Sequence, residues 1–367
     1  MALAPGRFTI APVATRESNQ QRGPFEGVLR GARPGALSSV GLVFVGIVGV
    51  WLLINLIKDP QDFFTVFLIG LTTGLVYALV ALGYTLVYGI LQLINFAHGD
   101  VFALTGLFAS TMILSVFNLT EESSTIMVIL GLAATLLAVT AFGATVNTVI
   151  ERVAYHPLLK APRLALLITA VGMSFIVQNI ALAIYDVNFR RVPELIPRTD
   201  VFEIGGVHYQ WNKFAVILVT VPVLMALSWL VQSTRQGKAM RATAQDPDAA
   251  AMVGIDVNRT ISFTFALAGG LAGVGGLLFL LQFNIRYDSG FELGLIAFTA
   301  AVLGGIGNLS GAVLGAVTIG LIQAFNEGLS WFTPGSDWTR SIIFGVLIAI
   351  LVFRPQGLLG EQTSDRA

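Results

Sequence analysis

The stretch between Asp62 and Glu121 carries almost no charge, and it constrains the fold more than any other part of the chain. It holds a single carboxylate, Asp100, and a single imidazole, His98. The hydrocarbon core of a bilayer is about 30 Å thick, and a helix crosses it with roughly 20 apolar residues. The stretch is therefore long enough for about two membrane spans, and the polar cluster at residues 95–100 marks the break between them.

The composition is that of a membrane protein. The chain is 55% hydrophobic and 11% charged, with a mean hydropathy of +0.80, whereas a soluble domain is about 25% charged. Its 367 residues leave room for roughly eight to ten spans, so we predict an all-α, polytopic helical bundle surrounded by lipid. The formal net charge of zero predicts no nucleic-acid partner. The lack of cysteine and the wide separation of the 3 histidines predict neither disulfides nor a metal site.

Ten apolar runs divide the chain into predicted spans. They cover residues 38–57, 63–88, 97–117, 125–150, 164–185, 214–233, 260–283, 291–306, 309–326 and 340–353. Cytoplasmic loops of membrane proteins carry an excess of Lys and Arg. With both termini and the loop at residues 234–259 in the cytoplasm, 14 of the 21 basic residues lie on that side. We therefore predict this orientation in the cell membrane.

The segments outside the spans complete the predicted organisation. The polar, Pro- and Gly-rich residues 1–35 predict a disordered cytoplasmic tail, residues 36–357 a transmembrane domain, and residues 358–367 a second cytoplasmic tail. A cleaved signal peptide is the alternative for the first run, but residues 40–57 exceed the usual 7–15-residue apolar core, and no Ala-x-Ala site follows. The long, charged loop at residues 186–213 predicts an external docking surface.

Two uncharged segments, residues 63–99 and 293–326, each contain a polar or glycine-rich break. Transporters often bind substrate where paired helices are interrupted near the midplane, because unwound backbone offers free N–H and C=O groups. The candidate translocation residues are Asn95, Phe96, His98, Gly99, Asp100, Gly304, Gly305, Gly307 and Asn308. The alternatives remain open: residues 304–311 also fit a tight turn between packed helices, and His98 and Asp100 also fit helix caps.

Glycines at GxxxG spacing predict close helix packing. The pairs and triplet are Gly70/Gly74, Gly269/Gly273 and Gly307/Gly311/Gly315. No glycine-rich run matches a phosphate-binding loop, because the Gly237-Lys238 pair lacks the upstream glycine that such a loop requires. We therefore predict that the chain is not itself an ATPase.

The loop at residues 234–259 contains the signals of a short helix. Asp246 is a suitable N-cap, Pro247 suits the first helical position, Asp248 places an acid in the first turn, and Gly254 is a stop signal. A short, capped helix held between two spans can transmit force to a cytoplasmic partner. The alternative is a helix lying flat on the bilayer, which the lack of a row of large apolar residues disfavours.

This loop and several other runs carry a family resemblance. Asp248-Ala249-Ala250, followed after three residues by Gly254, resembles the Glu-Ala-Ala-x3-Gly coupling loop of ATP-binding-cassette import permeases, with Asp in place of Glu and no Ile-x-Leu-Pro ending. Further runs are similar to the branched-chain amino acid permease family of the LivHM type, and most similar to its H-type subunit. They lie at residues 82–89, 94–100, 241–255, 263–265 and 304–307. The resemblance covers roughly residues 63–357.

The resemblance implies a permease subunit of an ATP-driven importer of branched-chain amino acids in a bacterial or archaeal cell membrane. It implies three kinds of partner: a second, paralogous permease, cytoplasmic ATPase subunits and an external substrate-binding protein. It implies no cofactor in this chain, because the partner subunits use the ATP, and it assigns ATPase coupling to Asp248, Ala249, Ala250 and Gly254.

Three other functions remain as alternatives. Urea and amide importers share the same signature. A proton-coupled secondary transporter would use His98 and Asp100 as a relay. A membrane enzyme would need a nucleophile, a metal site or an acid–base pair, and His98 and Asp100 are the only grouped candidates.

Overall fold

The structure is a computed structural model that describes residues 34–159, 161–353 and 356–359. Apart from two residues of each, the predicted tails at residues 1–35 and 358–367 lie outside this described part. The chain divides into two units between Leu52 and Leu53. Helix α2 (Pro34–Lys58) begins in the first unit, and everything below concerns the second.

Helices dominate the second unit, as predicted for an all-α membrane bundle. In chain order the elements are α3 (Pro60–Leu91), α4 (Ala97–Thr111), the π-helix η1 (Met112–Val116), α5 (Thr125–Ile150), the π-helix η2 (Glu151–Tyr155), the 3-10 helix η3 (His156–Leu158), α6 (Arg163–Tyr185), β1 (Asp200–Ile204), β2 (Val207–Gln210), α7 (Trp211–Ser233), α8 (Arg235–Gln245), α9 (Pro247–Met252), α10 (Val257–Leu280), α11 (Ser289–Gly304), α12 (Leu309–Gly328) and α13 (Ser336–Phe353). Each of the ten apolar runs corresponds to one helix, and 7 helical segments of the described chain are long and apolar enough to cross a membrane.

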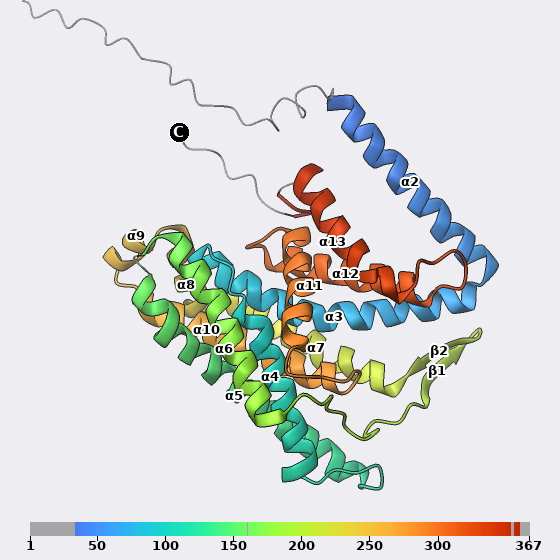
Figure 1. Cartoon of the computed structure of the whole chain (residues 1–367), viewed down its shortest axis with the longest axis horizontal. Coiled ribbons are helices and arrows are strands. Elements are labelled where there is room, and N and C mark those ends of the chain that lie inside the picture. The colour runs from blue at the N-terminus through green and yellow to red at the C-terminus, as the bar shows by residue number, and fades with distance from the viewer. Residues whose placement is uncertain (1–33, 160, 354–355, 360–367) are drawn as a thin grey trace, which may run out of the picture. The chain divides into compact units, whose positions relative to one another are not determined.

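Glycine pairs bring the central helices into close contact, as their spacing predicts. Helix α3 runs beside α12 (Figure 1), and a β-carbon at Gly74 would lie only 2.6 Å from the Val317 Cα. Helix α10 packs on α5 in the same way, because a β-carbon at Gly269 would lie 2.6 Å from the Asn147 Cβ. Such contacts let helices attract one another where lipid removes the hydrophobic driving force.

The first predicted helix break is present, but it lies a few residues earlier than expected. Helix α3 ends at Leu91, and Gln92 adopts a left-handed conformation with φ 51°. Helix α4 then begins at Ala97 with Phe96 as its N-cap. His98 and Asp100 are therefore helical, and Asp100 is not a cap. Its place in the first turn is favourable, because the positive end of the helix dipole stabilises a carboxylate there.

The second predicted break has the geometry of a tight turn between packed helices, which was the alternative interpretation. Gly305 and Gly307 have φ values of 107° and 94°, which favour glycine. Asn308 caps α12 by accepting a hydrogen bond from the Gly311 N–H at 2.9 Å. The turn is also held by the end of the described chain, where the N–H groups of Leu358 and Leu359 donate to carbonyls at the end of α11, at 2.8 and 2.9 Å.

The loop at residues 234–259 contains the predicted short helix, α9. The Asp246 carboxylate accepts hydrogen bonds from the backbone N–H groups of Asp248 and Ala249, at 2.9 and 3.0 Å. After Met252 the chain turns at Gly254, which has φ 86°. The Ile255 N–H donates to the Ala250 carbonyl at 3.1 Å, which is the closing bond of a Schellman motif.

Helix α8 was not predicted from the sequence. It starts after Thr234, whose hydroxyl accepts a hydrogen bond from the Gly237 N–H at 3.0 Å. Gly237 lowers the intrinsic helix propensity of this segment, so the local sequence alone favours a loop. In the structure Gly237 packs against the backbone of Leu230 and Val231 at the end of α7. Tertiary contact therefore decides the conformation of this segment.

The loop at residues 186–213 carries a β-hairpin that the all-α prediction omitted. Strands β1 and β2 pair antiparallel. Gly205 and Gly206 form the turn with φ values of 61° and 83°, as a two-residue hairpin requires. The Tyr209 hydroxyl and the Thr72 hydroxyl lie 2.6 Å apart, which attaches the hairpin to α3. The Gly205-Gly206 pair in the sequence could have indicated this hairpin turn.

The hairpin is expected to loosen as the pH rises. The imidazole Nδ1 of His208 lies 2.8 Å from the Asp200 carboxylate, and this hydrogen bond raises the pKa of His208. The protonated pair therefore stabilises the hairpin fully below the unfolded pKa of about 6.5, and that contribution is lost as the pH rises through the folded-state pKa. Hydrogen exchange of the β1–β2 amides, corrected for intrinsic rates, should show this small effect. The Asp200→Asn variant should show a weaker effect, because only the Glu203 carboxylate at 3.9 Å then remains beside His208. An equal pH dependence in that variant would contradict the assignment.

Candidate functional site

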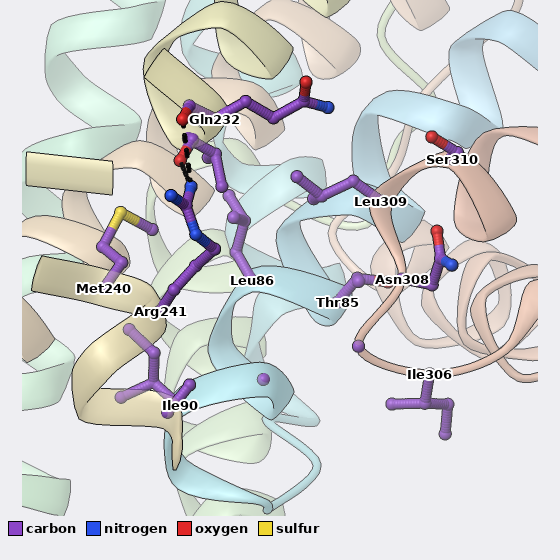
Figure 2. Close-up of a pocket in the computed structure, with 14 residues that line it drawn as sticks. Thr85, Leu86, Ile90, Gln232, Met240, Arg241, Ile306, Asn308, Leu309 and Ser310 are labelled. Carbon is purple, nitrogen blue, oxygen red and sulfur yellow. Dashed lines mark hydrogen bonds between the residues drawn. The ribbon is translucent and has the colours of Figure 1, made fainter. Parts of the chain in front are cut away.

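A cavity of about 590 Å³ lies where α3, α7, α8 and the α11–α12 turn meet (Figure 2). Helix α3 contributes its last turns, α7 its C-terminal end, and α8 the face that packs on the bundle. The lining residues are Thr85, Leu86, Gly89, Ile90, Val231, Gln232, Met240, Arg241, Ala244, Ile306, Gly307, Asn308, Leu309 and Ser310. Segments that are far apart in the sequence thus line one cavity.

A second cavity, of about 290 Å³, adjoins the first at the start of α12. The two cavities share Leu309 and Ser310. The second is lined mainly by aliphatic side chains from α3, α7 and α12, including Leu82, Leu224 and Val313. Together they follow one side of α3 over more than two helical turns. Leu309 and Ser310, at the start of α12, therefore border both cavities.

Polar groups are placed at the rim of the larger cavity. The Arg241 guanidinium donates through Nη1 to the carbonyls of Val231 and Gln232, which end α7 (Figure 2). The Asn308 side chain donates to the Leu359 carbonyl at 2.9 Å while it caps α12. The Thr85 hydroxyl is different, because it is buried and has no hydrogen-bond partner among the described residues.

The polar cluster after the first break holds helices together. The Asn95 Oδ1 accepts a hydrogen bond from the Tyr155 hydroxyl of η2 at 2.8 Å. The Asp100 carboxylate accepts hydrogen bonds from Ser174 and from Gln178 of α6, the latter at 2.9 Å. These bonds satisfy carboxylate and amide oxygens that would otherwise be costly to bury. The cluster therefore connects the start of α4 to two other segments.

His98 faces away from Asp100. Its ring is fully buried, lies against Gly83 of α3, and packs edge-on against the Tyr84 ring with 4.9 Å between centroids. Since His98 contacts α3 and Asp100 bonds to α6, the geometry does not favour a direct proton relay between them. Gly99 serves close packing, because a β-carbon there would lie 2.8 Å from the Gly294 Cα of α11.

The predicted translocation residues are thus separated in space. Gly307 and Asn308 line the larger cavity, and Gly304 and Gly305 form the turn beside it. Asn95, Phe96, His98, Gly99 and Asp100 do not belong to that lining. Their part in translocation stays a prediction. Sequence reasoning missed Thr85, Ile90 and Arg241 as cavity residues, because only the fold brings them to the α11–α12 turn.

The residues that the resemblance assigns to ATPase coupling differ in exposure. Asp248 is exposed and Ala249 half-buried, but Ala250 is only 3% exposed and faces the chain's own bundle. The most exposed apolar side chains at this end are Met252 and Val253, at 83% and 77%. Apolar residues directly before a glycine stop were the signal that could have identified them. Within the described part of the chain no cluster of three or more His, Cys, Asp or Glu side chains could hold a metal ion.

A bundle of apolar helices with two adjoining cavities and a capped helix pair at one end is typical of a multi-pass membrane transport protein. The chain belongs to the family described as "Branched-chain amino acid transport system / permease component", whose model matches residues 66–352.

Named relatives match along most of their length. The high-affinity branched-chain amino acid transport system permease protein BraD of Pseudomonas aeruginosa is 39% identical over 301 residues, which cover 81% of this chain and 95% of BraD. The permease LivH of Escherichia coli K12 is 34% identical over 302 residues, with coverage of 81% and 95%. A probable LivH of Methanocaldococcus jannaschii is 28% identical over 297 residues, with coverage of 77% and 88%.

Proposed function

We propose that the chain forms the translocation path for branched-chain amino acids in an ATP-binding-cassette importer. The observation that supports this substrate class most directly is the mainly aliphatic lining of the smaller cavity, which adjoins further aliphatic side chains in the larger one. A branched apolar side chain gains free energy by contact with such a surface. Urea and short amides have little apolar surface to bury, so the lining favours the amino acid over these alternatives.

The same proposal includes the partners of the complex. Cytoplasmic ATPase subunits use the ATP, and this chain holds no cofactor of its own. The α9 helix supports an ATPase contact, because its capped ends fix the backbone while Met252 and Val253 project from it. Exposed apolar side chains on a short helix suit a groove in a partner. A second permease and an external substrate-binding protein complete the proposed assembly.

Uptake by the purified complex in proteoliposomes tests the function. We expect ATP-dependent uptake of labelled leucine with the external binding protein present, and little uptake of urea or acetamide under the same conditions. A proton-coupled transporter would instead need no ATP and would stop when an uncoupler collapses the proton gradient. Uptake of urea but not leucine would reassign the substrate class.

The orientation is expected to follow the basic residues, with the α8–α9 loop in the cytoplasm. The chain has no cysteine, so single cysteines can be labelled without background. An impermeant thiol reagent should label Glu203→Cys in β1 from outside intact cells, and should label Gln245→Cys only after the cells are opened. Both positions are exposed in the structure. Ready labelling of Gln245→Cys in intact cells would reverse the topology.

Loss of Asn95 is expected to slow transport more than it harms assembly. The Asn95→Ala change leaves the buried Tyr155 hydroxyl without its partner, which costs about 1–3 kcal/mol and loosens the break between α3 and α4. We expect initial leucine uptake to fall by about tenfold or more, and His98→Ala to act similarly because it empties the space against Gly83. Initial rates per assembled complex provide the measurement.

The matched control for this change is Asn179→Ala. Asn179 lies on the exposed face of α6, where its amide donates to the Phe175 carbonyl one turn earlier. Uptake by this variant should stay close to that of the unaltered chain. If Asn95→Ala and His98→Ala also transport at the unaltered rate, the polar cluster has a structural role alone.

A further inference from the structure

We propose that the loop between α12 and α13, residues 329–335, is a lipid anchor that inserts the Phe332 side chain into the interfacial layer of the bilayer. The contact surface consists of Trp331 and Phe332, and its partner is the lipid of the leaflet on the β-hairpin side. The inference needs only the membrane placement of the helices, and it does not depend on the substrate or its path.

Phe332 combines an unfavourable backbone conformation with an exposed side chain. Its φ is 55°, and a bulky residue in this left-handed region is a genuine outlier. The side chain is 83% exposed, with its ring beside that of Trp331 at 5.7 Å between centroids. Glycine or asparagine would suit this backbone better. The backbone therefore does not explain the phenylalanine, and strain of this kind often marks a functional position.

The loop that carries Phe332 is held in place by side-chain hydrogen bonds. The Asn55 amide pairs with both backbone groups of Trp331, because its Nδ2 donates to the carbonyl and its Oδ1 accepts from the N–H, each at 3.3 Å. The Asn326 amide donates to the Gly335 carbonyl at 2.7 Å. These bonds fix the loop on both sides of Phe332. The exposed ring is thus presented by an ordered backbone.

The neighbouring helices place this loop at the surface of the bilayer. It joins the end of α12 directly to the start of α13. Trp338, in the first turn of α13, is 60% exposed and lies on the same face of the helix as the exposed Val352. Tryptophan is enriched where a span meets the membrane–water interface. Trp338 therefore marks the level of the interface only a few residues after Phe332.

A lysine beside the aromatic pair favours lipid over a protein partner. The Lys58 ammonium lies 4.4 Å from the centroid of the Trp331 ring, and Lys58 is the last residue of α2. Lysines at the ends of spans keep their stems in the apolar layer while the ammonium reaches the headgroups. The loop therefore offers a positive charge to a lipid phosphate and an apolar ring to the acyl chains.

The β-hairpin supplies a reference position on the same side of the membrane. A β-carbon at Gly206 would lie 2.5 Å from the Gln61 Cδ, so the hairpin turn packs on the first turn of α3. That turn follows Lys58 in the chain. The Glu203 side chain in β1 is charged and 64% exposed. Glu203 is thus a water-exposed position to compare with Phe332.

The first experiment measures the surroundings of a nitroxide label at Phe332→Cys in the full complex in lipid nanodiscs. The chain has no cysteine of its own, so the label is unique within it. Paramagnetic resonance records collisions with oxygen, which dissolves in lipid, and with a nickel chelate, which stays in water. We expect the ratio of oxygen to chelate collisions to be at least about fivefold higher at Phe332→Cys than at Glu203→Cys.

Two other results of this experiment overturn the inference. Equal ratios at the two positions would mean that residue 332 lies in water. Few collisions with either reagent would mean that protein covers the loop. If that protection appears only when the external binding protein is added, the loop is a docking surface for that protein and not a lipid anchor.

The second experiment tests whether the aromatic ring itself holds the loop in lipid. The label is moved to Ser330→Cys, an exposed position of the same loop, and residue 332 is varied. Phe332→Asn keeps a residue that tolerates the left-handed conformation but loses the apolar ring. We expect it to lower the oxygen-to-chelate ratio at the label by about threefold or more. Phe332→Trp should retain the ratio.

Equal ratios with phenylalanine, asparagine and tryptophan at position 332 would overturn the inference, because the ring would then contribute nothing to the placement of the loop. Size-exclusion chromatography of each variant checks that the complex is assembled. Neither experiment uses leucine uptake. A failure of the proposed function would therefore leave the lipid anchor to be decided by the label alone.

Discussion

Gly254→Leu is expected to leave the chain folded and inserted while it uncouples ATP hydrolysis from uptake. Gly254 has φ 86°, and a residue with a β-carbon pays about 1–2 kcal/mol to adopt a left-handed conformation. A β-carbon at this position would meet nothing within 4 Å. The strain therefore arises from the backbone and is relieved by unwinding the end of α9. Met252 and Val253 would then lose their fixed direction.

Uptake and ATP hydrolysis by the reconstituted complex measure this effect. We expect uptake per ATP hydrolysed to fall by roughly tenfold. The matched control is Gly254→Asn, because asparagine tolerates the left-handed conformation better than other residues with a β-carbon. Its coupling should lie close to that of the unaltered chain. Normal coupling in Gly254→Leu would show that the end of α9 does not transmit the movement.

Gly269→Leu is expected to prevent stable assembly of the bundle. Gly269 lies on α10 against α5, where even a β-carbon would lie 2.6 Å from the Asn147 Cβ and would overlap the Gly143 backbone. The Asn147 amide also crosses this contact to donate to the Phe265 carbonyl at 2.7 Å. A leucine would separate the two helices and break that bond. We expect the free energy of unfolding to fall by more than about 3 kcal/mol.

Thermal unfolding in detergent measures the loss of stability. Size-exclusion chromatography of each variant provides the second measurement. The matched control is Gly172→Leu, which puts the same side chain into α6 at a position where a β-carbon meets nothing within 4 Å. This control should elute and unfold like the unaltered chain. Equal stability of the two variants would mean that the α5–α10 contact contributes little to the fold.

The helices could be predicted from sequence because lipid imposes a local requirement. A span must be apolar over its full length. The apolar runs at residues 125–150 and 214–233 therefore each indicate a helix from their local composition alone. The end of α3 was harder to place. Gln92 leaves the helix through a left-handed conformation, which the sequence does not mark, so the break was placed nearer to the more conspicuous His98.

The larger cavity could not be predicted because its walls are distant in sequence. Thr85, Met240 and Asn308 meet only after α3, α8 and the α11–α12 turn have packed. Taken singly, each of these residues fits an ordinary local role: inside a helix, on one face of an amphipathic helix, or as a helix cap. The burial of Ala250 could not be predicted for a related reason, since a helix as short as α9 has too little periodicity to show which side is buried.

The hydrogen bonds that Leu358 and Leu359 donate to the end of α11, and the bond from Asn308 to the Leu359 carbonyl, impose an order on biosynthesis. A chain made from its N-terminus inserts its early helices while later ones are still on the ribosome. The turn that forms one wall of the cavity is completed by residues made some fifty positions later, since Asn308 and Leu359 are 51 residues apart. The cavity therefore acquires its final shape after all the described helices have been translated, and an incomplete chain cannot present a finished site.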